Sequence, residues 1–176
     1  MLIEANNLIG LPIGAIEENQ YLGKVRDILV ERKNGTVMGL IVGHGVPFFE
    51  NKLFLADMDI LDIDKNGVTT RTQENLIDPQ EILRAKKNIE EKFNLVNLPA
   101  NTKNGKYLGK ISNYVIDTVT MQIIKYYVHG LFEDKIISNN QVIKISKKEI
   151  IFENDLLIGN AKSNPNENYK NKLVID

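Results

Sequence analysis

Two related pentapeptides, Tyr21–Val25 (YLGKV) and Tyr107–Ile111 (YLGKI), decide the fold of this chain. They coincide when the sequence is shifted against itself by 86 residues, and the match runs without a gap as far as Val30–Glu31 on Ile116–Asp117. Self-similarity over such a distance indicates a duplicated structural unit.

The match extends in both directions. Upstream, Asn7–Leu8 aligns with Asn94–Leu95 after a one-residue adjustment. Downstream, a four-residue adjustment aligns Asp59–Ile60 with Glu149–Ile150, and Leu55 with Ile145. Each copy is therefore expected to be a unit of about the same size and topology.

The local pattern within each copy is that of short strands. In the first copy, apolar residues lead to the turn residues Asn34–Gly35 and then to the β-branched run Val37–Val42, which is typical of a hairpin. In the second copy Thr118–Met121 stands before Ile123–Val128, and we expect a turn of another type there. Short strands without intervening helices predict a mainly β protein built as small barrels.

Two glycines, Gly23 and Gly109, occupy matching positions ahead of the first long strand of each copy. We expect the backbone there to adopt positive φ or to pass close to another strand. A phosphate-binding loop is the alternative, but a single Gly-Lys step lacks the spaced glycines of such a loop.

A short helix is predicted between the copies, over residues 78–93. Asp78 is expected as its N-cap, Pro79 as its first residue and Glu81 as the partner in a capping box. Its apolar stripe, expected to pack on the protein's own barrels, consists of Ile82, Ala85, Ile89 and Phe93. The chain then divides into a first barrel (1–77), a connector helix (78–93), a second barrel (94–162) and a polar tail (163–176).

The YLGKV step, the Asn-Gly turn, the following apolar strand and an acid-Ile step before a short final strand resemble the PRC-barrel family. The resemblance covers about residues 5–75 and 92–160 and implies two tandem PRC barrels joined by a helix. That family includes the cytoplasmic domain of the photosynthetic reaction-centre H subunit and a domain of a 16S ribosomal RNA maturation factor. This chain looks closer to the stand-alone two-barrel proteins of Gram-positive bacteria.

Composition excludes several classes of protein. The 22 basic and 23 acidic residues nearly cancel, so the whole molecule has no strong attraction for polyanions. The absence of cysteine removes disulfides, thiolate nucleophiles and cysteine-based metal sites, and it fits a reducing cytoplasm. Neither a secretory signal nor a membrane-spanning run is found, so we expect a cytoplasmic protein without membrane insertion.

Two patterns could hold a metal. Asp62–Gly67 fits the first half of a calcium loop, but the twelfth position is Gln73 rather than glutamate, so a hairpin turn at Asn66–Gly67 is favoured. His44 and His129 lie at the ends of corresponding strands without the spacing of ligands. We therefore predict no catalytic residues, no metal and no cofactor.

Two sets of residues are candidates for partner binding. Phe48 and Phe49 are adjacent aromatics in a loop, and two neighbours cannot both face the same side of a strand. Lys106 and Lys110 belong to a basic second half, since residues 94–176 contain eleven basic and eight acidic residues, whereas residues 1–77 contain seven and eleven. The lysines of this basic surface are Lys103, Lys106, Lys110, Lys144, Lys147 and Lys148.

These features favour a non-enzymatic adaptor that binds a protein partner, with a ribosome or another RNA-containing assembly as one setting for it. One alternative is direct RNA binding by the basic second barrel, which contains no arginine, the preferred donor to phosphate. The other is a small-molecule or metal-dependent enzyme with a pocket near His44 or His129.

Overall fold

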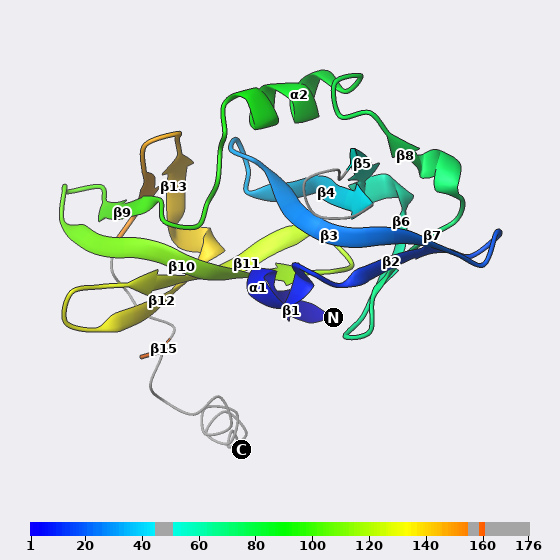
Figure 1. The fold of residues 1–176 in the computed structure, drawn as a ribbon. Coiled ribbons are helices and arrows are strands. Elements are labelled where there is room, and N and C mark those ends of the chain that lie inside the picture. Colours follow the sequence, from blue (N-terminus) through cyan, green and yellow to red (C-terminus); the bar gives the residue numbers. More distant parts are fainter. Residues whose placement is uncertain (45–50, 155–158, 161–176) are drawn as a thin grey trace, which may run out of the picture.

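The computed structural model describes residues 1–44, 51–154 and 159–160, and these residues form a mainly β protein whose strands make one curled sheet (Figure 1). The first strands are β1 (Leu2–Glu4), β2 (Pro12–Ala15), β3 (Gln20–Glu31), β4 (Thr36–His44), β5 (Asn51–Ala56), β6 (Ile60–Ile63), β7 (Val68–Thr70) and β8 (Leu76–Ile77). The later strands are β9 (Pro99–Thr102), β10 (Tyr107–Asp117), β11 (Gln122–His129), β12 (Asp134–Ser138), β13 (Val142–Ile145), β14 (Ile150–Phe152) and β15 (Gly159–Asn160). The helices are α1 (Ala5–Leu8) and α2 (Leu83–Glu90), with 3-10 turns at Asp57–Asp59, Gln73–Asn75 and Asn139–Gln141.

Strand pairing follows the same scheme in the two halves of the chain. In residues 1–77, the first half, β2 pairs with β3 antiparallel and with β7 parallel, β6 pairs with β7, and β3 continues through β4 to β5. In residues 94–162, the second half, β9, β10, β11, β12, β13 and β14 pair in the corresponding manner. The hairpin predicted after Tyr21–Val25 is confirmed as β3 and β4.

The structure corrects the downstream alignment of the halves. The 3-10 turn and strand at Asp57–Ile63 correspond to Asn139–Ile145, so Ile60 matches Val142 and not Ile150. Leu55 lies on β5, whose counterpart is β12, and therefore does not match Ile145. The two acid-Ile steps are similar in sequence but lead into different strands: Asp59–Ile60 leads into β6, and Glu149–Ile150 leads into β14, the counterpart of β7.

The two predicted glycines have the expected backbone. Gly23 has φ of 143° and Gly109 has φ of 138°. A side chain at either position would collide with the backbone of the neighbouring strand, at Gly43 or at His129. Their role is thus to let two strands approach closely.

The expectation of a different turn in the second half was wrong. Both hairpins have four turn residues, and the last of these has positive φ, 67° at Gly35 and 53° at Met121. Met121 is buried, so packing of its side chain stabilises a backbone conformation that its residue type disfavours.

The tips of these two hairpins join the halves. Thr36 of β4 pairs with Gln122 of β11, and the amide of Val37 donates to the carbonyl of Met121 at 2.8 Å. Fully buried residues from both halves form one continuous hydrophobic cluster; they include Ile13, Leu40, Leu55, Ile116, Ile123, Tyr126 and Phe152. Tyr126 and Phe152 meet edge to face with ring centroids 5.7 Å apart.

The N-terminal segment packs on the second half of the chain, although the two are far apart in sequence. Strand β1 pairs with β10, with Ile3 opposite Ile116 (Figure 1). The carboxylate of Glu4 accepts hydrogen bonds from Asn113 at 3.0 Å and from the hydroxyl of Tyr127 at 3.0 Å. Sequence patterns did not predict this long-range pairing.

The helix between the halves is shorter than predicted. It begins after Ile82, whose side chain makes no capping bond, so the expected N-cap at Asp78 and capping box at Glu81 are wrong. Asp78 instead accepts from the amide of Gln80 at 2.8 Å, which closes a separate turn before the helix. The apolar stripe packs on the rest of the protein as expected. Buried Ala85 and partly buried Ile82 and Ile89 join a cluster with Leu29, Ile41 and Phe54, and Phe93 packs against the main hydrophobic cluster.

Within the described residues, no helix has the length and apolar character needed to cross a membrane.

Candidate functional site

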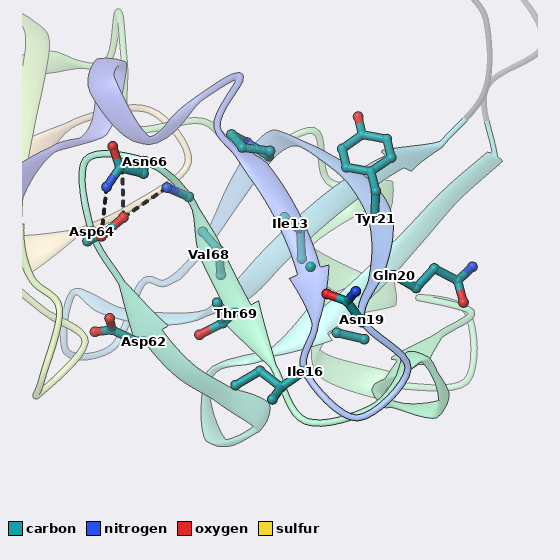
Figure 2. A pocket seen from close by; sticks show the side chains of 14 residues that line it. Ile13, Ile16, Asn19, Gln20, Tyr21, Asp62, Asp64, Asn66, Val68 and Thr69 are labelled. Carbon is teal, nitrogen blue, oxygen red and sulfur yellow. Dashed lines mark hydrogen bonds between the residues drawn. The ribbon is translucent and has the colours of Figure 1, made fainter.

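A groove of about 560 Å³ lies on the outer face of the first half (Figure 2). Strand β2 crosses it between β3 on one side and β7 on the other. Because side chains alternate along a strand, Ile13 and Ala15 are buried in the core, while Pro12 and Gly14 face the groove and exposed Ile16 continues its edge.

Gly14 forms the open floor of this groove. Its backbone is not in the positive-φ region, and a Cβ atom there would meet only the carbonyl oxygen of Gln20 at 3.5 Å, an ordinary contact. Gly67, at the groove end, differs because a Cβ atom would come within 2.8 Å of the carbonyl oxygen of Pro12. Backbone geometry therefore requires glycine at position 67 but not at position 14.

The second half has side chains at both corresponding positions. By strand register, Asn101 matches Gly14 and Glu149 matches Gly67. The amide of Asn101 donates to the carboxylate of Glu149 at 2.6 Å, so the two side chains meet over strands β9 and β14. The groove of the first half owes its opening to the pair of glycines.

One side of the groove carries an exposed aromatic ring among polar side chains, whereas the other side is acidic. Tyr21 and Ile16 are both exposed, the tyrosine to 53%. Across β2 lie Asp62 and Asp64 (Figure 2). An exposed aromatic ring facing negative charge suits a ligand that carries both a hydrophobic group and a cation.

Asp64 closes the turn between β6 and β7 and accepts hydrogen bonds from its backbone. Its Oδ1 accepts from the amides of Asn66 at 2.7 Å and Gly67 at 3.0 Å, and these bonds lower the pKa of Asp64 below its ordinary value. Ser146 closes the corresponding turn, where its hydroxyl accepts from the amides of Lys148 and Glu149. Asp64 is therefore ionised at neutral pH.

The corresponding outer faces differ in charge. Strand β6 places Asp62 opposite Thr69, and β13 places Lys144 opposite Ile151 in the same register. An acidic residue in one half thus stands where the other half has a lysine.

The first half, which contains the groove, is the part of the chain that matches a known family. Residues 1–76 match the PRC-barrel domain family. The groove lies wholly within this PRC-barrel match, since its lining runs from Pro12 to Thr69. No curated protein matches the chain.

The calcium interpretation of Asp62–Gly67 in the PRC-barrel match is not supported by the fold around it. The segment is the hairpin between β6 and β7, as favoured from sequence, and the amide of Asp64 donates to the carbonyl of Gly67 at 3.0 Å. Across the described ranges, no group of three or more His, Asp or Glu side chains is placed to hold a metal ion.

The predicted partner-binding lysines do not line the groove. Phe48 and Phe49 lie outside the described residues. Lys106 and Lys110 are exposed on the second half, and Lys110 stands opposite His129 in the sheet. Of the other basic residues, Lys103 forms an ion pair with Glu153, and Lys147 forms one with Glu91 at 2.9 Å.

Both histidines lie at strand ends, as predicted. His44 is the last residue of β4, and His129 is the last of β11. The exposed ring of His129 lies 2.6 Å from the carboxylate of Asp134. His129 does not line the groove.

Sequence reasoning missed two further exposed features. Leu131 and Phe132, between β11 and β12, are exposed to 86% and 99%. They follow His129–Gly130 directly, and Phe48–Phe49 follows His44–Gly45 after two further residues, so comparison of the two copies could have identified them. The groove could have been found in the same way, from glycine at position 14 against asparagine at 101.

Proposed function

We propose that residues 94–162 are a second PRC-barrel copy and that the chain is a non-enzymatic adaptor, which binds a protein partner through the groove of the first barrel. The duplication is supported by the shared pairing scheme, by the positive φ shared by Gly35 and Met121, and by the turns that Asp64 and Ser146 close. In this arrangement α2 connects the barrels, and a cytoplasmic location accords with the lack of cysteine.

The single observation that carries the binding role is the glycine floor. A strand interior loses stability with glycine relative to alanine, and nothing in the backbone or packing at Gly14 demands it. The residue keeps open a surface that Asn101 and Glu149 occupy in the other half. Binding of a partner in the groove accounts for this loss of strand stability.

The rims define the ligand by charge complementarity. The proposed occupant is a linear segment of a protein that places an aliphatic or aromatic side chain against Ile16 and Tyr21. A lysine or arginine of the same segment would approach Asp62 and Asp64. Acidic side chains at the rim disfavour RNA at this groove, because they repel phosphate.

RNA binding by the basic second half is less well supported than protein binding at the groove. Lys103 and Lys147 are already ion-paired with Glu153 and Glu91. We assign no reaction to the groove, because the carboxylate of Asp64 is held by hydrogen bonds within its own turn and is not directed at a substrate.

A library of random linear peptides displayed on phage tests the proposal. Selection on the wild-type protein should enrich peptides with an apolar residue near a lysine or arginine. The variant Gly14→Asn, which introduces the residue of the second half, should weaken the enriched peptides at least about tenfold, since one lost hydrophobic side chain corresponds to about 1.5–3 kcal/mol.

A matched pair of tyrosines provides the control. Tyr21→Ala should weaken binding, whereas Tyr107→Ala should not, although Tyr107 is exposed to 50% in the second half. Enrichment of the same peptides by Gly14→Asn, or equal losses for the two tyrosine variants, would refute binding at the groove.

A further inference from the structure

A second recess, separate from the groove, lies between the β3–β4 hairpin and α2. This cationic cleft has a volume of about 310 Å³. Its lining consists of Glu31, Arg32, Lys33, Met38, Arg84, Lys87 and Asn88. Four of these side chains are cationic and one is a carboxylate, and the cleft contains two of the chain's four arginines.

Both arginines of the cleft lie beside carboxylates, and Arg32 is the more restrained of the two. Arg32 is ion-paired with Glu91, and its guanidinium lies over the ring of Phe93 at 5.4 Å. Arg84, whose side chain is 72% exposed, lies 3.9 Å from the carboxylate of Glu31. The restraint on Arg32 lowers the conformational entropy that is lost when a ligand binds.

Asn88 supplies an independent sign of a ligand. The residue is only 7% exposed, and its Nδ2 donates to the carbonyl of Val30 at 2.8 Å. Its Oδ1 has no hydrogen-bond partner among the described residues, although it is buried. A buried acceptor without a donor is costly, and a small shift of the Asn88 side chain toward the cleft that it lines would let a donor from a ligand satisfy it.

The matching place in the second half has no such character. By the 86-residue shift, Arg32 and Lys33 correspond to Thr118 and Val119. Strand β1 pairs there with the end of β10, at Asp117, so a backbone strand takes the place that α2 has in the first half. The cationic cleft is therefore a property of one half alone.

From these observations we propose that the cationic cleft binds a small phosphate monoester that also carries a hydroxyl group. Arg32, Lys33, Arg84 and Lys87 would surround the phosphoryl oxygens, as guanidinium and ammonium groups do in phosphate sites. The hydroxyl of the ligand would donate to Oδ1 of Asn88. The volume is at the lower end of small-molecule sites, which suits a ligand of this size.

Amide chemical shifts in an NMR titration with glycerol 3-phosphate test the site, with inorganic phosphate as the second ligand and chloride at matched ionic strength as the blank. Glycerol 3-phosphate should give saturable shifts around Lys33 and Lys87. Its affinity should exceed that of inorganic phosphate by about tenfold, the value of one hydrogen bond to a group otherwise left unpaired. Equal affinities, or shifts that never saturate, would overturn the proposal.

Two adjacent lysines on α2 give the matched variants. Lys87→Gln should weaken glycerol 3-phosphate by about tenfold, as expected for one charge-assisted bond, while Lys86→Gln, outside the cleft, should not. The same losses from both variants would indicate attraction by general charge and contradict a built site. Competition by a short single-stranded RNA, with the same dependence on Lys87, would assign the cleft to nucleic acid and overturn the small-molecule proposal.

Discussion

The contrast between Gly109 and Gly14 gives the sharpest test of the fold and of the groove together. Alanine at position 109 would have to adopt φ of 138°, and its Cβ would lie 2.7 Å from the carbonyl carbon of His129. Backbone strain of about 1–3 kcal/mol and a steric cost of about 1–3 kcal/mol add to roughly 4 kcal/mol. Alanine at position 14 meets no such obstacle and should stabilise the strand by about 0.5–1 kcal/mol.

Urea unfolding followed by far-UV circular dichroism measures both effects. With a slope of about 2 kcal/mol per M, Gly109→Ala should lower the midpoint by about 2 M, and Gly14→Ala should raise it slightly. A loss below about 1 kcal/mol for Gly109→Ala would refute the close approach of β10 and β11. A loss of similar size for both variants would refute the assignment of Gly14 to a ligand rather than to the fold.

Three further predictions concern single side chains. Ion pairing with Lys147 lowers the pKa of Glu91. Ionised Glu91 therefore stabilises the fold above its unfolded pKa, and this stabilisation is lost as the pH falls through its folded pKa. Glu91→Gln should flatten the acid limb of a plot of the urea midpoint against pH. Desolvation raises the pKa of Asp27 above its ordinary value, so the ionised carboxylate destabilises the fold. Asp27→Asn, which introduces the asparagine of the matching position 113, should therefore raise the urea midpoint at pH 7. This gain should disappear near pH 3. Tyr126→Phe removes a hydroxyl that donates a 3.0 Å hydrogen bond, and thermal unfolding should show a loss of about 1 kcal/mol; an unchanged melting temperature would contradict that bond's contribution.

Much of each half could be predicted from sequence because its signals are local. The Asn34–Gly35 turn and the apolar run after it specify a hairpin wherever they occur. The two glycines at matching positions predicted close strand contacts, since a repeated backbone constraint places glycine twice at the same step. The turn closed by Asp64 was also predicted, as a hairpin, from its Asn-Gly pair.

The remaining features depend on contacts that sequence periodicity does not encode. The pairing of β1 with β10 joins residues more than a hundred positions apart, and Leu2–Glu4 carries no signal for its partner. The start of α2 was misplaced because Asp78 can close either a helix or a separate turn, and packing at Ile82 decides between them. The groove was missed because each copy was compared for its similarities, whereas the difference between Gly14 and Asn101 defines it.

The position of β1 also sets an order of events during synthesis. Strand β1 leaves the ribosome before its partner β10, which extends to Asp117. At about 5–20 residues per second, roughly 5–20 s pass between the synthesis of the two strands. During that interval the first half must persist without its N-terminal segment in place, and the native arrangement can close only when most of the second half has emerged.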